Sequence, residues 1–250
     1  MAINRYLSDD RLLDAFEALR HGKAGDELFV ARHIEQECHS ATRAEYQVGL
    51  ILSGRPIQRF DPAPDGALAV TLVVPTPEQV DAARELARRC EDFGRRAARD
   101  HHVDAVALEA RLLTIDDAVG LAETIATHRV PATPYRLRTV LASRDPVAIT
   151  LLDEDLTTRW QRQSIQPLPT SLFGAPSPAM QLVGCDLGMD CGPTSFVALL
   201  GCLDQASVCG LDVPGQLLSL RALLDRQSIE DTRTRFFDAI TRGDYAFWGF

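Results

Sequence analysis

Four of the six cysteines lie within one short stretch, C-D-L-G-M-D-C-G-P-T-S-F-V-A-L-L-G-C-L-D-Q-A-S-V-C-G, which runs from Cys185 to Gly210. Cysteine sulfur at this density serves as a nucleophile, as a metal ligand or as half of a disulfide. Five, ten and six residues separate the successive cysteines, whereas structural zinc sites bring their ligands in pairs separated by roughly two to four residues. The spacing argues against a metal, so the sequence predicts no metal ligand.

Other combinations that catalyse reactions or hold cofactors are also missing from the sequence. His101, His102 and Asp104 stand close together, but neighbouring side chains point apart on a helix, so we expect them in a solvated loop. Lys23, the single lysine, lacks the upstream glycine of a Walker loop. The acid run Asp153-Glu154-Asp155 is expected to be solvated, because a glycosidase needs its two carboxylates opposed across a cleft. We predict no cofactor.

Disulfide bonds are the remaining use for the clustered cysteines. Cys185 and Cys191 bracket one glycine-containing loop, and Cys202 and Cys209 bracket another loop that ends at a glycine. Both loops are short and flexible enough to reach bonding geometry, so local pairing of 185 with 191 and of 202 with 209 is simplest. Crossed pairing, such as 185 with 202 and 191 with 209, stays open.

The other two cysteines, Cys38 and Cys90, lie on the apolar faces of two long predicted helices. They are placed to form a third disulfide across a helix pair, and two separate core thiols are the alternative. An even number of clustered cysteines without a catalytic partner favours an oxidising compartment. We therefore predict a periplasmic or secreted protein, with the cytoplasm as the alternative location.

The segment M-D-C-G-P-T-S-F-V-A-L-L around Cys191 resembles the nucleophile segment of papain-like peptidases that cleave double-glycine leaders. The resemblance implies that Cys191 is a nucleophile at the start of a helix, whose N-terminus activates the thiol. The histidine base of that family follows the cysteine, whereas the last histidine here is His128, upstream. We therefore predict no catalytic residue, and a papain-like hydrolase using Cys191 with His128 or His101 is the alternative.

Apolar residues recur with a helical period along most of the chain. A first helix is predicted to end at Gly22, and a second to run from about Asp26 to Leu52. Arg59–Gly66 contains two prolines and a glycine and is predicted to be a loop. Short helices with short connections predict an all-α fold, either a helical-hairpin array or an irregular bundle. Further helices are expected at 103–113, 118–127, 135–142 and from 146 onward.

Several helix boundaries have sequence signatures. Thr76-Pro77-Glu78-Gln79 supplies an N-cap, a proline at the first helical position and a capping-box glutamine. Asp145 is predicted to cap the helix that begins at the proline after it. Ser195 is predicted to lie in the first turn of a helix, and Ser228 is predicted to open the last helix, which Gly243 ends.

Prolines mark a boundary late in the chain. Four of them fall between Ser164 and Pro178 without any helical period. We predict a helical array over 1–163, a proline-rich connection over 164–178, and a cysteine-rich helical part over 179–250 that is stapled by disulfides. The aromatic tail is expected to fold back on the core, because exposed aromatic rings are costly. Its members are Tyr245, Phe247, Trp248 and Phe250.

Charge and hydropathy exclude two classes of partner. The net charge of -9 is spread over both halves, so neither half is a basic arm that could bind the phosphate backbone of a nucleic acid. We therefore expect no nucleic acid as a partner. The longest apolar run, Ala67–Val74, has the length of a strand, so we expect no membrane span. The start M-A-I-N-R-Y lacks an apolar signal region, which fits a cytosolic protein or one whose leader has been removed.

The C-terminal pattern supports a resemblance of its own. Q-L-V-G-C-D-L-G-M-D-C-G, then C-L-D-Q-A-S-V-C, then an acidic-capped helix and R-G-D-Y-A-F-W-G-F resemble a group of uncharacterised, mostly exported bacterial proteins with tetratricopeptide-like helices. The resemblance implies export and a helical fold, and it implies no activity. We predict a non-enzymatic binding or scaffold protein of the bacterial cell envelope whose partner is another protein. An acidic inhibitor or immunity-type protein is one form of this hypothesis.

Overall fold

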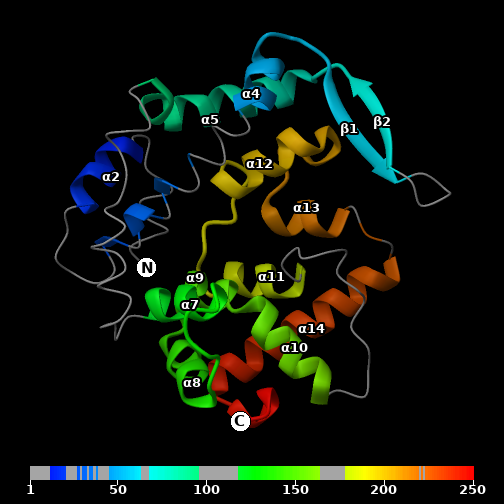
Figure 1. Ribbon diagram of the computed structural model, residues 1–250. Helices are drawn as coiled ribbons and strands as arrows, with labels where there is room; N and C mark the ends of the chain where they lie inside the picture. The colour runs from blue at the N-terminus through cyan, green and yellow to red at the C-terminus, as the bar shows by residue number, and fades with distance from the viewer. Residues whose placement is uncertain are drawn as a thin grey trace.

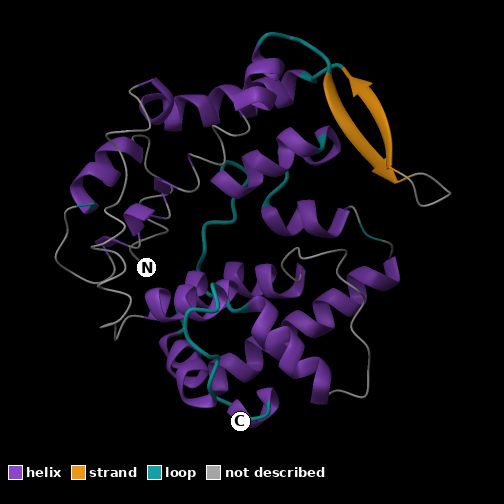
Figure 2. Cartoon of the chain, in the orientation of Figure 1, coloured by secondary structure: helices purple, strands orange, loops and turns teal. Residues whose placement is uncertain are grey.

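The computed structural model describes residues 12–20, 27–28, 30–32, 34–35, 38, 45–62, 68–95, 118–163, 178–219, 221 and 223–250. Helices make up most of this part of the chain (Figure 2), which confirms the predicted all-α fold. Its two strands, β1 (Ile57–Pro62) and β2 (Leu68–Val73), form one antiparallel hairpin. The α-helices are α2 (Leu12–Leu19), α4 (Glu45–Leu52), α5 (Pro77–Arg95), α7 (Ala118–Ala126), α8 (Pro134–Ser143), α9 (Pro146–Leu151), α10 (Asp153–Gln163), α11 (Pro178–Asp186), α12 (Phe196–Asp204), α13 (Val213–Ser219) and α14 (Leu223–Arg242), with 3-10 turns η1 (Ala206–Val208) and η2 (Tyr245–Trp248).

A first hydrophobic core joins the N-terminal helices to α12, which comes from the far end of the sequence. Buried side chains of α2, α4 and α5 and of the helical residues between 27 and 38 form this core together with Phe196, Leu199 and Leu203 of α12. In Figure 1, α4 and α5 lie along the top and α12 lies beneath α5, which it contacts. Packing of these apolar faces positions α12.

A second core lies below the first (Figure 1). It is formed by the helices α7, α8, α9, α10 and α11 together with α14. The C-terminal aromatic tail folds back onto it, as predicted. The Trp248 ring is 1% exposed and lies 4.8 Å from the Phe236 ring, centroid to centroid. The Phe236 ring in turn meets Trp160 edge to face at 5.3 Å. Such aromatic contacts add to the free energy of burial.

Two predicted helix starts are confirmed by their hydrogen bonds. The backbone nitrogen of Thr76 donates to Gln79 Oε1 at 3.1 Å, and the Gln79 nitrogen donates to Thr76 Oγ1 at 3.3 Å, which is a reciprocal capping box. Asp145 Oδ1 accepts from the backbone nitrogens of Val147 and Ala148 at 2.9 and 3.0 Å. These bonds satisfy amide donors that have no partner inside the helix.

Three local predictions are wrong. Residues 59–62, predicted as loop, belong to β1, because pairing with β2 gives this stretch strand partners as far as Pro62. Ser228 lies inside α14, which begins at Leu223, because tertiary contacts extend the helix beyond its local capping signal. Asp153, expected in solvent, is buried and accepts a hydrogen bond from Thr157 Oγ1 at 2.8 Å. The predicted helix 103–113 lies outside the described residues.

The helices of the predicted 179–250 part are shared between the two cores. α12 packs on α5 in the first core, whereas α11 and α14 contact each other and α11 contacts α9 in the second. At the end of α11, Arg233 of α14 donates to both carboxylate oxygens of Asp186 at 2.7 and 2.5 Å. These hydrogen bonds raise the pKa of the Arg233 guanidinium and fix the end of α11 on α14.

The contact between α9 and α11 depends on a glycine. A Cβ atom at Gly184 would lie 2.7 Å from Thr150 Cγ2 and 3.3 Å from Met189 Cε. Thr150 cannot move aside freely, because its Oγ1 donates to the carbonyls of Pro146 and Val147 in its own helix. The two helices therefore approach each other more closely than a residue larger than glycine allows.

We expect Gly184→Ala to lower the free energy of unfolding by about 1–3 kcal/mol, because overpacking outweighs the better helix propensity of alanine. The control is Gly49→Ala in α4, where nothing lies within 4 Å of the added Cβ. That substitution is expected to be neutral or to stabilise by up to about 1 kcal/mol. Urea unfolding of both variants measures the difference, and equal effects would contradict the close approach of α9 and α11.

Candidate functional site: the disulfide-bonded helix α12 and the exposed hairpin

All six cysteines are bonded in the structure, and the pairs are Cys38–Cys90, Cys185–Cys191 and Cys202–Cys209. The Cα atoms of the three pairs are 5.4, 5.7 and 4.5 Å apart. The clustered cysteines thus have the local pairing and not the crossed one. Cys38 and Cys90 are joined rather than being separate core thiols.

Cys38–Cys90 lies inside the first core. The exposed fractions of Cys38 and Cys90 are 0% and 3%, and both belong to the apolar cluster of that core. The bond joins α5 to a residue that is 52 positions earlier in the sequence. Closing so long a loop removes much conformational entropy from the unfolded chain.

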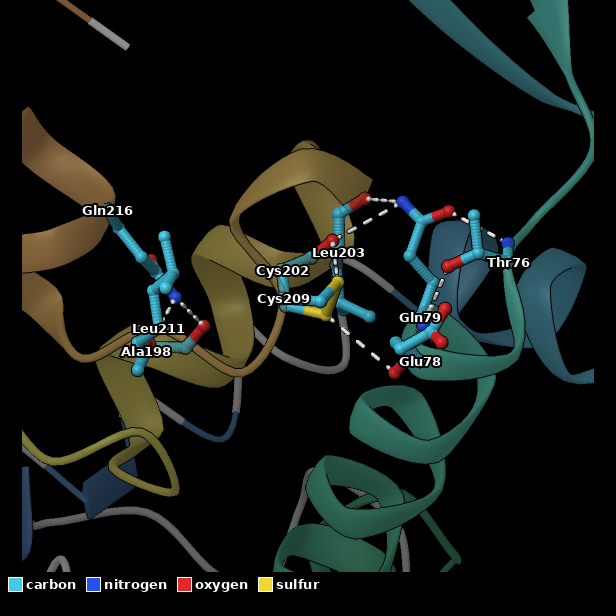
Figure 3. Close-up of a disulfide and its surroundings, with 9 residues drawn as sticks. All are labelled: Thr76, Glu78, Gln79, Ala198, Cys202, Leu203, Cys209, Leu211 and Gln216. Carbon is cyan, nitrogen blue, oxygen red and sulfur yellow. Dashed lines mark hydrogen bonds between the residues drawn. A yellow bond between two sulfur atoms is a disulfide. The ribbon is translucent and has the colours of Figure 1, made fainter. Parts of the chain in front are cut away.

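Cys202–Cys209 lies where the end of α12 meets the start of α5 (Figure 3). Gln79 is 2% exposed, and its Nε2 donates to the carbonyl oxygens of Cys202 and Leu203 at 3.3 and 2.9 Å. Cys202 Sγ lies 3.7 Å from the Glu78 carbonyl oxygen. That approach is a van der Waals contact, because a disulfide sulfur carries no hydrogen. Gln79 therefore caps two helices at once, α5 with its oxygen and α12 with its nitrogen.

A second buried amide holds the other side of α12 (Figure 3). Gln216 of α13 is buried, and its Nε2 donates to the carbonyl oxygens of Ala198 and Leu211 at 2.8 and 3.1 Å. A Cβ atom added at Gly201 would lie only 2.1 Å from Gln216 Oε1. Gly201 is thus needed for α13 to approach α12, and α12 is held from both sides by amide side chains.

The start of α12 is tied to α5 by a charged group. The Arg89 side chain, which is buried, donates through NH2 to the Thr194 carbonyl oxygen at 3.1 Å and through Nε to Glu85 Oε1 at 2.8 Å. Hydrogen bonds from Arg88, the largest cause, and from Arg89 lower the pKa of Glu85 to about 2, although burial acts in the opposite direction. The Glu85 carboxylate therefore stays ionised at neutral pH and orients Arg89 toward the chain that precedes α12.

The papain-like alternative has no thiol to use in this state, because the Cys191 sulfur is bonded to Cys185. Ser195 is the N-cap of α12, accepting from the Ala198 nitrogen at 3.3 Å, so Cys191 precedes the helix rather than starting it. His128 is exposed in the turn after α7, and His101 lies outside the described residues. The structure gives this alternative no supporting contact, and it stays a prediction.

Two carboxyl groups of the second core have perturbed acidities. Burial raises the pKa of Glu123, against the opposing charges of Arg32 and Arg129. Burial also raises the pKa of Asp155, although the charges of Arg159 and His128 act in the other direction. In the part of the chain that the structure describes, no group of three or more histidine, cysteine or acidic side chains is placed to hold a metal ion.

The hairpin β1–β2 carries an exposed apolar face. Val70, Leu72 and Val74 point to one side of β2 and its continuation, with exposed fractions of 54%, 70% and 69%. The opposite face is anchored, because Ile57 is buried in the first core and its register partner Val73 packs against that core. Figure 1 shows the hairpin at the upper edge of the molecule, projecting beyond α12.

Comparison of the chain with protein-family models, with curated proteins and with solved structures finds no match. The resemblance to exported bacterial proteins stays a prediction. Among the helices of the described residues, none is both long and apolar enough to cross a membrane. The three disulfides are typical of proteins from oxidising compartments.

Two features of the site escape sequence reasoning. Gln79 is recognised as a capping-box residue, but its second role requires carbonyl groups 123 and 124 positions away. The strand length of Ala67–Val74 is visible in the sequence, whereas its exposed apolar face is not. Alternating polar and apolar residues would have shown which face lies outward, and L-A-V-T-L-V does not alternate cleanly.

We expect Gln79→Glu to lower the free energy of unfolding by about 2–4 kcal/mol at neutral pH, because a buried carboxylate then faces two carbonyl oxygens. Burial raises the pKa of this new carboxyl above its unfolded value, so the loss is complete above the raised folded-state pKa and shrinks as the pH falls from there toward the unfolded pKa. Urea unfolding between neutral and acidic pH measures the effect. The control is Gln58→Glu on the exposed hairpin, and equal losses for both would contradict the double cap.

The three disulfides are expected to contribute unequally to stability. Replacing both cysteines by alanine should lower the free energy of unfolding by about 4 kcal/mol for Cys38–Cys90 and by about 2 kcal/mol for each of the other pairs, since the entropy of loop closure grows with loop length. Their sequence separations are 52, 6 and 7. Denaturant unfolding of the three double variants tests the ranking, which a larger loss from either short loop would refute.

Proposed function

We propose that the protein is a non-enzymatic binding or scaffold protein of the bacterial cell envelope and that it takes a partner protein on its β1–β2 hairpin. The observation that carries the proposal is the apolar face of β2, where Leu72 is 70% exposed and Val70 is 54% exposed. Contiguous apolar surface is costly in water, and where it persists on a folded protein it commonly marks an interaction site.

The occupant that fits this surface is an extended segment of the partner. Within the described residues β1 pairs only with β2, so each strand keeps one edge without a strand partner. An added strand would form hydrogen bonds along such an edge, while its alternate side chains cover Val70 and Leu72. The net charge of -9 favours a partner with a basic surface. An inhibitor or immunity-type protein that masks a basic partner is one concrete form.

The compartment is part of the same proposal. A chain of 250 residues buries a sizeable core without cross-links, so folding alone does not require three disulfides. All six cysteines are nevertheless bonded. Such bonds persist in oxidising surroundings and are rare in the cytosol, which supports a periplasmic or secreted location.

The test compares three immobilised proteins, namely the unmodified chain, Leu72→Ser and Leu223→Ser, against an envelope extract of the cell of origin. Leu223 is the matched control, because it is a leucine of similar exposure, 78%, on α14. We expect a protein that is retained by the unmodified chain and by Leu223→Ser, and whose retention falls about tenfold or more with Leu72→Ser, as for loss of an interface anchor. Equal retention by all three proteins would refute the hairpin as the docking surface, and retention by none would refute the binding function.

A further inference from the structure

The three disulfides differ in their access to solvent. In the Cys38–Cys90 bond both cysteines are buried, with exposed fractions of 0% and 3%. In the Cys202–Cys209 bond Cys202 is buried, with an exposed fraction of 3%. Cys209, the partner of Cys202, is partly exposed, and Cys185–Cys191 is the one pair in which both cysteines are partly exposed. Thiol–disulfide exchange requires a thiolate to reach a sulfur atom, so exposed disulfides react before shielded ones.

The bond that is partly exposed at both of its cysteines lies on the connection between the two cores. Cys185 is in the last turn of α11, which belongs to the second core, and Cys191 is on the segment 187–195 that leads to α12 in the first core. Figure 1 shows this segment rising from α11 to α12. The disulfide therefore ties Cys191 back to the end of α11 and restrains the segment that connects α11 to α12.

The two ends of the bond are held very differently. On the Cys185 side, the following residue Asp186 is fixed to α14 by two hydrogen bonds from Arg233. On the Cys191 side, the Cys191 carbonyl accepts a hydrogen bond from the Val213 nitrogen at 2.9 Å, which ties the connection to the first residue of α13. Loss of the disulfide would thus leave α11 in place and leave the Cys191 side tied by the Val213 hydrogen bond and, at Thr194, by the hydrogen bond from Arg89.

We propose that Cys185–Cys191 is a redox-sensitive joint whose reduction loosens the segment 187–195 and the start of α13 while both cores stay folded. The reductant is a dithiol. One of its thiolates attacks a sulfur of the bond, the mixed disulfide is resolved by the second thiol, and two electrons and two protons pass to Cys185 and Cys191 as the dithiol becomes a disulfide. This inference is independent of the hairpin.

The first experiment measures the order of reduction. The native protein is treated with increasing dithiothreitol, quenched with iodoacetamide and analysed by peptide mapping. We expect Cys185 and Cys191 to be labelled about tenfold faster than the other four cysteines, because access governs the exchange rate. Earlier or simultaneous labelling of Cys202 and Cys209, or of the buried pair Cys38 and Cys90, would overturn the proposal.

The second experiment measures amide hydrogen exchange in the native protein, in the protein reduced at this one bond and in Cys185→Ser/Cys191→Ser. We expect exchange of the Val213 amide and of residues 187–195 to rise about tenfold or more, with no change in α5 and α14. The matched control is Cys202→Ser/Cys209→Ser, which breaks a loop of similar length and should leave the Val213 amide unchanged. Unchanged exchange at Val213, faster exchange throughout both cores, or failure of the 185/191 variant to fold would each refute the joint.

Discussion

The side-chain amide of Gln79 is the contact on which the first core depends. It joins the start of α5 to the end of α12, elements whose bonded residues are 123 positions apart. The last carbonyl groups of a helix have no partner within it, and burial against α5 keeps water from those of Cys202 and Leu203. Each unsatisfied buried acceptor would cost about 1–3 kcal/mol. By satisfying both oxygens, one amide removes a cost that would otherwise offset part of the free energy gained from the apolar packing of α12.

The position of α12 constrains the rest of the C-terminal part. Because α12 belongs to the first core and α11 to the second, the chain must cross between cores over residues 187–195. Each disulfide serves a different step in this arrangement. Cys38–Cys90 fixes α5, against which α12 packs, Cys202–Cys209 holds the turn beside the carbonyls that Gln79 caps, and Cys185–Cys191 shortens the crossing itself.

Local signals in the sequence are reliable where the partner is near in the chain. The capping box of Thr76 and Gln79 and the Asp145 cap form as predicted, because donor and acceptor are within three residues. Interactions beyond a single helix turn are not visible in such local signals: pairing with β2 makes residues 59–62 part of a strand, and packing lets α14 begin before Ser228. The same reason hides the second role of Gln79 and the exposed face of β2.

The hairpin depends on this framework for its rigidity. Its inner face is fixed where Ile57 is buried and Val73 packs against the first core, and α4 contacts both β1 and α5. A two-stranded sheet alone is marginally stable in water, so the apolar outer face exists in a defined conformation only because the inner face is anchored. A surface that is already ordered loses less conformational entropy when it binds. The Cys38–Cys90 bond and the Gln79 cap, by holding the first core together, therefore also support the surface formed by Val70 and Leu72.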